Sequence, residues 1–272
     1  MIGLLRRGRR QRAGELNHVR IGEGPPLLLL HTLGGTLVQW NPVIERLAEE
    51  REVIAVDMPG FGDSPELPAG VEPSPPNLAS AVLDFYESLG LDTPGVAGIS
   101  LGGWVAIECG RQGGARAVVA LCPAGFWREP FTPGHPAAHY AARVLGPAAP
   151  ILLRVPGVQR AALAGNFRHP ERPSTKEAIA MVRGYGATRS YIEANRLMSE
   201  GLAGDLSDLK VPLTIAWAEH DQVVRNKPLK KGILPRRVKQ VELPGCGHVP
   251  TWDDPDLTTR IILEGTRKGG LR

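Results

Sequence analysis

The sequence predicts an α/β fold, with a mostly parallel central sheet flanked by helices and a mainly helical insertion in its second half. Short runs of Val, Ile and Leu alternate with amphipathic segments up to residue 123 and resume after residue 205, as expected for strands joined by crossover helices. Residues 124–204 hold no strand-like run and are rich in Ala, Pro and Gly. We therefore expect a core of residues 14–123 and 205–272, an inserted helical unit over 124–204, and a basic arm over 1–13.

Seven segments have the composition of strands. Most are short apolar runs bounded by Gly, Pro or charged residues, and the run Leu27–Leu30 lacks the polar and apolar alternation of a half-exposed strand. Because such a strand is covered on both faces, we expect it to be central in the sheet. The expected strands span residues 16–21, 27–31, 52–57, 95–99, 116–121, 212–217 and 237–243.

Helix boundaries are indicated by capping residues and by apolar periodicity. Asn41 followed by Pro42 suits a helix start, with Asn41 as the N-cap and the proline in the first turn. A later segment, residues 78–89, places apolar residues on one helical face and ends at Gly90. Further helices are expected over residues 101–112, 176–183 and 191–200 and from Pro255 onward.

The composition indicates a globular chain with no membrane span. Of the 272 residues 42% are hydrophobic, and no apolar run approaches the ~20 residues that cross a bilayer. Residues 1–20 carry a charge of +5, which leaves −1 for the other 252 residues. This basic arm has no aromatic residue to stack on bases, and no apolar stretch follows it as a secretion signal would require. We expect no nucleic-acid partner, no membrane partner, a cytoplasmic location and a monomer or homodimer.

The cysteines indicate neither a disulfide framework nor a metal site. Three of them, Cys109, Cys122 and Cys246, cannot all pair with one another and show no C-x-x-C spacing. This usage suits a reducing compartment. We therefore expect the protein to work without a metal and without a cofactor.

A candidate nucleophile lies in the sequence Gly98-Ile99-Ser100-Leu101-Gly102. The G-x-S-x-G pattern is short, but here it joins a predicted strand to a predicted helix, which is the arrangement of a nucleophile elbow. The sharp turn presents the Ser100 hydroxyl above the helix N-terminus, where free N–H groups favour negative charge. The alternative is a Gly-rich turn in which the serine only caps the helix.

A base and an orienting acid follow in the order that a serine nucleophile of this type needs. Asp221 lies just after the sixth predicted strand, and His248 lies in a Gly-rich loop after the seventh. Because the carboxyl ends of parallel strands meet at one edge of a sheet, we expect His248 to take the Ser100 proton while Asp221 orients the histidine. Three rival acids rank below Asp221: Glu219, and then Asp205 and Asp208.

Negative charge that develops on a substrate oxygen needs preorganised N–H donors. The Leu101 N–H directly follows the nucleophile, and the Leu33 N–H lies in the Gly-rich loop after the strand that ends at His31. We expect these two groups to form an oxyanion hole. The alternative for the Leu33 loop is an ordinary Gly-rich turn at a strand end.

Together these motifs resemble the α/β-hydrolase superfamily over residues 14–266. Residues 22–31 are similar to its strand before the oxyanion loop, residues 56–64 to its D-x-P-G-x-G-x-S turn, and residues 244–248 to its histidine loop. The resemblance implies an α/β-hydrolase fold in which residues 124–204 form a helical lid over the pocket.

Smaller differences separate the branches of the superfamily. Residues 31–34 are similar to the His-Ser-Leu-Gly of enol-lactone hydrolases, which favours a lactone or small ester. Residues 246–248 and 40–41 resemble carbon–carbon hydrolases of ring-cleavage products, although Ile99 stands where those usually carry Asn. Haloalkane dehalogenases and epoxide hydrolases use Asp at the elbow, so Ser100 argues against both.

By the same resemblance, aromatic residues of the lid and of the elbow helix would line an apolar pocket. Aromatic residues in a small helical unit also serve as packing, so both roles stay open. The residues expected to contact substrate are Trp104, Phe126, Trp127 and Tyr140.

The sequence thus predicts a cofactor-independent serine hydrolase that cleaves a small or medium, largely apolar carboxylic ester or lactone through an acyl-enzyme. A carbon–carbon bond hydrolase or a perhydrolase on the same triad are alternatives within the enzyme class. A non-catalytic ligand-binding protein of the same fold is the alternative outside it, because a fold does not determine function.

Overall fold

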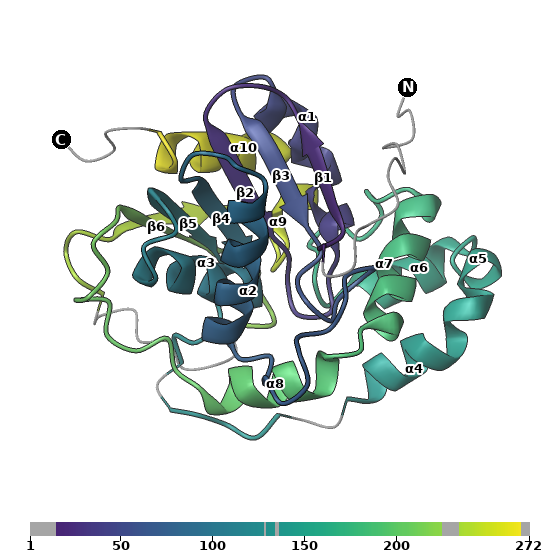
Figure 1. The fold of residues 1–272 in the computed structure, drawn as a ribbon. Coiled ribbons are helices and arrows are strands. Elements are labelled where there is room, and N and C mark those ends of the chain that lie inside the picture. Colours follow the sequence, from purple (N-terminus) through teal and green to yellow (C-terminus); the bar gives the residue numbers. More distant parts are fainter. Residues whose placement is uncertain (1–14, 128, 134–135, 225–233, 268–272) are drawn as a thin grey trace.

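A computed structural model of the chain describes residues 15–127, 129–133, 136–224 and 234–267. Within them a seven-stranded sheet runs through the molecule, with helices on both faces and a helical layer at one end (Figure 1). The predicted basic arm over residues 1–13 lies outside the described residues. No helix in the described ranges is long and apolar enough to cross a membrane.

The sheet has the order β1-β3-β2-β4-β5-β6-β7. β1 pairs antiparallel with β3, and the other neighbours are parallel, which confirms the predicted α/β class with a mostly parallel sheet. The strands are β1 (His18–Ile21), β2 (Pro26–Leu30), β3 (Glu52–Val56), β4 (Gly95–Ile99), β5 (Ala117–Leu121), β6 (Leu213–Ala218) and β7 (Lys239–Leu243).

Alternate side chains of the central strands supply two separate cores. Leu28 and Leu30 of β2 pack on the face covered by α2 and α3, whereas Leu27 and Leu29 pack on the face covered by α1 and α10. All five residues of β2 are buried because helices cover both faces (Figure 1). This explains why the run shows no alternation of polar and apolar residues.

The helices of the core are η1 (Leu37–Trp40), α1 (Asn41–Ala48), α2 (Pro75–Ser88), α3 (Leu101–Arg111), α9 (Pro250–Asp253) and α10 (Pro255–Gly265). The expected N-cap at Asn41 is wrong, although the helix does begin there. The 3-10 turn η1 runs directly into α1, so Trp40 occupies the cap position and Asn41 instead donates a side-chain hydrogen bond to Glu177.

The insertion between β5 and β6 is helical, as its composition predicts. It holds α4 (Ala137–Leu145), η2 (Gly146–Ala148), α5 (Ala149–Leu152), α6 (Pro156–Leu163), α7 (Thr175–Ala187) and α8 (Tyr191–Glu200). Three prolines, Pro147, Pro150 and Pro156, stand in the first turns of η2, α5 and α6, where a missing N–H is tolerated. They divide the first part of the insertion into short helices.

We expect Gly102→Ala to lower the free energy of unfolding by about 1–3 kcal/mol, because overpacking against rigid backbone cannot be relieved by side-chain rotation. A Cβ at Gly102 would lie 2.4 Å from the carbonyl oxygens of both Leu30 and His31. The start of α3 can therefore lie this close to the end of β2 only because residue 102 has no side chain. Urea unfolding followed by circular dichroism measures the change.

The matched control is Gly157→Ala in α6, since a Cβ there meets no atom within 4 Å. That variant should be neutral or more stable, because alanine restricts the unfolded chain. Equal midpoints for the two variants would contradict the packing argument.

Candidate active site

The chain turns sharply at Ser100, between β4 and α3. Ser100 has φ 57° and ψ −118°, a left-handed conformation that side chains other than glycine rarely adopt. Gly98 and Gly102 stand on either side because a Cβ at Gly98 would lie 2.0 Å from the Gly102 carbonyl oxygen. The predicted strand, turn and helix are therefore present, and the strain fixes the serine at the end of β4.

Asp221 and His248 meet at the same sheet edge. They follow β6 and β7, which lie parallel to β4, so all three carboxyl ends point the same way. His248 Nδ1 lies 2.8 Å from Asp221 Oδ2, and both side chains are buried. The backbone N–H groups of Val223 and Val224 donate to the other carboxylate oxygen at 2.8 and 2.9 Å. Nδ1 is thus the donor to Asp221, and Nε2 is left for another partner.

The protonation of Asp221 follows from these contacts. Burial by itself would raise the pKa of this carboxyl. The hydrogen bond and charge of His248, together with the two backbone N–H donors, outweigh burial and lower the pKa below its usual range. An ionised Asp221 accepts a hydrogen bond from the Nδ1–H group and thereby selects the histidine tautomer that a general base needs.

The three rival acids lie elsewhere. Glu219 is exposed and accepts a hydrogen bond from the Gly245 N–H. Asp205 binds Ser207, and Asp208 pairs with Arg111 at the surface. Asp205 and Asp208 precede β6, and of the four carboxylates only Asp221 contacts His248 among the described residues.

The predicted oxyanion donors are both available. Within the described ranges, neither the Leu33 N–H nor the Leu101 N–H donates a hydrogen bond. Gln39 shapes the Leu33 loop, because its side chain accepts from the Thr32 N–H at 3.1 Å and donates to the Thr32 hydroxyl at 3.0 Å. Sequence reasoning missed Gln39, since a glutamine before Trp40 carries no distinctive pattern.

His31 has a structural role beside this loop. Its Nε2 accepts from the Met58 N–H at 2.9 Å, so Nδ1 carries the proton donated to the Thr32 carbonyl at 2.8 Å. Complete burial lowers the pKa of His31, which keeps the ring neutral. A neutral ring with both nitrogens occupied ties the loop that holds Leu33 to the turn after β3.

Ser100 and His248 line one cavity of about 610 Å³ beneath the insertion. No hydrogen bond joins these two side chains in the described structure, and such contacts often tighten only when substrate is bound. Leu33, Trp127, Phe131 and residues of α6, α7 and α8 line the rest of the cavity. A volume of this size suits a small or medium organic molecule.

Three of the four predicted substrate contacts lie away from this cavity. Trp127 lines it, but Phe126 faces a smaller separate cavity and packs edge-on against Trp217 at 6.1 Å. Tyr140 is 47% exposed on the outer side of α4. Trp104 packs behind the cavity wall, where its ring fills space beside Gly125 and Gly201 that a Cβ would occupy. Phe126 and Trp104 serve packing, which is the alternative left open for aromatic residues, and Tyr140 is largely exposed.

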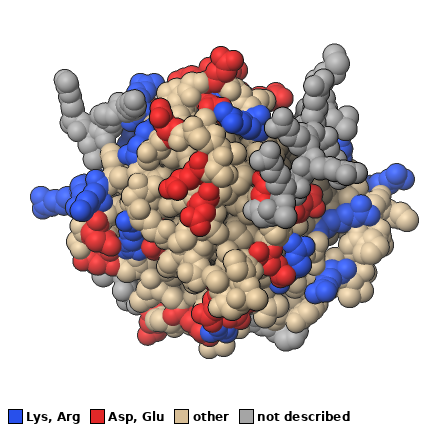
Figure 2. All heavy atoms as spheres, viewed as in Figure 1, with Lys and Arg blue, Asp and Glu red and all other residues tan. Residues whose placement is uncertain are grey.

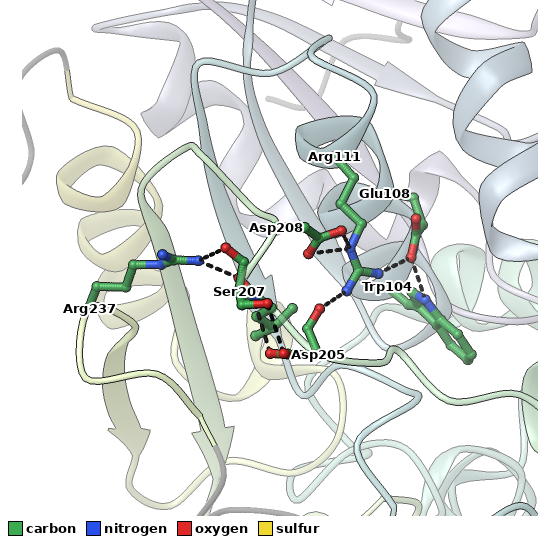
Figure 3. Close-up of polar contacts among 8 residues, drawn as sticks. Trp104, Glu108, Arg111, Asp205, Ser207, Asp208 and Arg237 are labelled. Carbon is green, nitrogen blue, oxygen red and sulfur yellow. Dashed lines mark hydrogen bonds and ion pairs between the residues drawn. The ribbon is translucent and has the colours of Figure 1, made fainter.

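A polar network along one face of α3 anchors Trp104 (Figure 3). The indole Nε1 donates to Glu108 at 3.0 Å, and Glu108 pairs with Arg111 at 2.6 Å. Arg111 also donates to the carbonyl of Asp205 at 2.7 Å. Because Trp104 packs edge-on against Trp127 at 6.4 Å, the network supports the cavity wall without contacting a ligand.

Asp253 is a further site residue without a signal in the sequence. Its carboxylate accepts from the N–H of Gly247 at 2.8 Å, and from those of Arg168 and His169 at 3.0 and 2.8 Å. Gly247 directly precedes His248. The buried carboxylate therefore holds the histidine loop to the insertion, a contact between segments far apart in the chain.

Cys122 brings a thiol beside the acid and base. One ligand atom each of Cys122, Asp221 and His248 lie within 4.8 Å of one another, and no other such group occurs in the described residues. Burial, followed by the charge of Asp221, raises the pKa of the Cys122 thiol well above its usual value. A protonated thiol and an already paired carboxylate and imidazole are poor donors for a resident metal ion.

Comparison with known proteins places the whole arrangement in a family. Residues 27–261 match the model of the alpha/beta hydrolase family. The chain belongs to the alpha/beta hydrolase family. The seven-stranded sheet and the strained turn at Ser100 agree with this assignment.

Individual relatives of this alpha/beta hydrolase carry different names. The epoxide hydrolase EphH of Mycobacterium tuberculosis is 30% identical over 200 residues, which cover 68% of this chain and 91% of that protein. Two further curated relatives are matched over 54% and 31% of their own lengths.

Solved structures share the fold at lower identity. An esterase from Thermogutta terrifontis superposes with a TM-score of 0.66 at 21% identity, covering 92% of each chain. The enol-lactonase from Burkholderia xenovorans LB400 superposes with a TM-score of 0.64 at 21% identity, covering 91% of this chain and 95% of the other. At this level of sequence identity the structural similarity shows a shared fold and does not show a shared function.

Proposed function

We propose that this hydrolase cleaves a neutral, largely apolar carboxylic ester or lactone through an acyl-enzyme on Ser100. The observation that carries the proposal is that the strained Ser100 and the Asp221-bonded His248 open onto one cavity. Ser100 Oγ attacks the carbonyl carbon and passes its proton to His248 Nε2, while the N–H groups of Leu33 and Leu101 bind the developing oxyanion.

Collapse of the tetrahedral intermediate breaks the ester bond. His248 gives the proton to the leaving oxygen, which departs as an alcohol or, in a lactone, stays tethered to the acyl group. A water molecule then transfers a proton to His248 and attacks the acyl-enzyme, which releases the carboxylic acid and restores Ser100. No further reagent is needed.

The lining of the cavity favours an uncharged substrate. Among its described residues there is no Asp, Glu, Lys or Arg. Two buried hydroxyls in the lining, those of Thr36 and Ser199, have no hydrogen-bond partner in the described structure. A carboxylate placed there would lose water without gaining a cation, whereas a neutral oxygen could accept from a hydroxyl. This argues against substrates that carry a carboxylate.

Epoxide hydrolysis, the activity in the names of two curated relatives, suits this elbow poorly. Attack of Ser100 on an epoxide carbon would form an alkyl ether on the enzyme. An ether has no carbonyl at which a water molecule could attack, so the covalent product would persist. An ester or lactone leaves an acyl group that water can remove.

We expect kcat/KM for p-nitrophenyl butyrate to exceed that for mono-p-nitrophenyl succinate by about 100-fold, the rough cost of burying an unpaired carboxylate. The two esters share the leaving group and have acyl chains of similar length, so the comparison isolates the charge. Release of p-nitrophenolate at pH 7.5 measures both rates, with Ser100→Ala as the blank.

Equal kcat/KM values for the two esters would show that the substrate charge is not excluded by the cavity. If neither ester is cleaved, a fluorophosphonate probe distinguishes a reactive serine from an inert one. Failure to label Ser100 would contradict the acyl-enzyme proposal and favour the ligand-binding alternative.

A further inference from the structure

Apolar side chains gather on the outside of the insertion. Ten large hydrophobic residues are exposed in the described structure, and seven of them lie between residues 140 and 158. We name these seven the apolar patch: Tyr140, Val144, Leu145, Ile151, Leu152, Val155 and Val158. Val144 and Ile151 are the most exposed, at 76% and 73%. A cluster of this kind on a soluble protein usually marks an interaction surface.

The patch is carried by α4, α5 and α6 and the turns beside them. These helices form one end of the molecule, away from α2 and α10 (Figure 1). Their inner residues, such as His139, Leu153 and Leu163, are buried. The patch therefore is the outer face of a packed unit and has no covering element in the described structure.

The charge around the patch is mainly positive, although Glu171 lies in the same hollow as Arg154 and Arg160. Residues 131–170 contain four arginines and neither Asp nor Glu. Arg143, Arg154 and Arg160 are exposed and form no ion pair within the described residues. At the right-hand end of Figure 2, where α5 lies, the visible spheres are blue and tan. On the rest of the face shown in Figure 2, red and blue spheres are mixed.

We propose that the apolar patch and its arginines dock the protein on a membrane surface that contains anionic lipid. Apolar side chains would enter the boundary between headgroups and acyl chains, and the arginines would bind lipid phosphates from the same side. The complementarity of charge selects this partner. An apolar surface with more arginines than acidic residues around it matches a negatively charged lipid layer, while a second copy would set arginine against arginine.

The docking site adjoins the cavity. Ala138 of α4 and Ala161 and Ala162 of α6 line the cavity and belong to the helices that carry the patch. Docking is peripheral and goes beyond the proposed hydrolysis, since binding requires no reaction at Ser100. It also differs from the sequence-based expectation of no membrane partner, which rested on the lack of a spanning segment.

Co-sedimentation with sucrose-loaded vesicles tests the proposal on the full chain. We expect the protein to bind vesicles of phosphatidylcholine and phosphatidylglycerol at 7:3, and to bind pure phosphatidylcholine more weakly. The double variant Val144→Ser/Ile151→Ser should lower the partition coefficient by tenfold or more, because the membrane contact of both side chains is lost. Arg154→Gln should lower it about fivefold on the anionic vesicles only.

The matched control is Ile192→Ser on α8, since Ile192 is 43% exposed but lies outside the patch. It should bind as the unchanged protein does. All variants keep the N-terminal arginines, so any difference in vesicle binding among them measures the contribution of the apolar patch and its arginines. Thermal unfolding by circular dichroism checks that the variants remain folded.

Three results would overturn the proposal. The first is no binding to either kind of vesicle. The second is equal binding by the double variant and the unchanged protein, which would assign binding to the basic arm. The third is a dimer in light scattering that the double variant dissociates, which would show that a second copy covers the patch.

Discussion

Ser100→Ala and His248→Ala are each expected to lower kcat for p-nitrophenyl butyrate by roughly 10⁴–10⁶-fold, to the residual level of binding and the oxyanion donors. Ser100→Ala removes the atom that forms the acyl-enzyme. His248→Ala leaves a serine hydroxyl with no base, and a hydroxyl is a weak nucleophile at neutral pH. Because the two side chains act as a unit, the double variant should be no slower than either single one.

Initial rates of p-nitrophenolate release, corrected for the rate without enzyme, measure the loss. Ser88→Ala and His220→Ala are matched controls, since both residues are exposed and outside the cavity. Mass spectrometry after fluorophosphonate labelling should place the adduct on Ser100 in the unchanged protein, with much slower labelling of His248→Ala. Full activity of Ser100→Ala would assign the hydrolysis to another group.

Asp221→Asn is expected to lower kcat about 10⁴-fold while the fold is kept. The asparagine has nearly the same shape, but the orientation of its amide now decides whether His248 Nδ1 donates or accepts. With the amide nitrogen toward the ring, the proton moves to Nε2 and His248 can no longer accept the Ser100 proton. The matched control is Glu219→Gln, an exposed acid two residues away, which should keep most of the activity.

The same variant has a predicted pH dependence of stability. The pKa of Asp221 is lower in the folded state than in the unfolded chain. The ionised carboxylate therefore stabilises the fold above about pH 4. This stabilisation is lost as the pH falls through the folded-state pKa. Asp221→Asn should therefore be less stable than the unchanged protein at pH 7, and this gap should narrow at pH 3. Urea unfolding at both pH values measures it, and a gap that widens in acid would contradict the assignment.

The strands and the order of the candidate catalytic residues could be predicted from local pattern. Leu27–Leu30 is apolar throughout because both faces of β2 are covered, and Asp221 and His248 follow strands that any parallel sheet would bring to one edge. The expected cap at Asn41 was wrong because capping depends on the preceding segment, and η1 occupies the cap position.

The substrate contacts could be predicted only in part. Trp104, Phe126 and Tyr140 have the right residue type, but their direction depends on helix packing. Trp104 turns toward Glu108, and Tyr140 is 47% exposed on α4. Gln39 and Asp253 could not be found from the sequence. Gln39 binds the backbone of a loop whose shape has no sequence signature, and Asp253 binds backbone N–H groups of segments that are far apart in the chain.

For this protein, then, the sequence by itself determined the α/β class, the family and the elbow at Ser100, because those depend on short-range periodicity and on turns that need glycine. Only the tertiary structure decided that Asp221 rather than Glu219 contacts His248, that the cavity has no charged residue in its described lining, and that α4, α5 and α6 expose an apolar face. These are properties of side chains from separate segments, and their directions are set by packing, which no local pattern encodes.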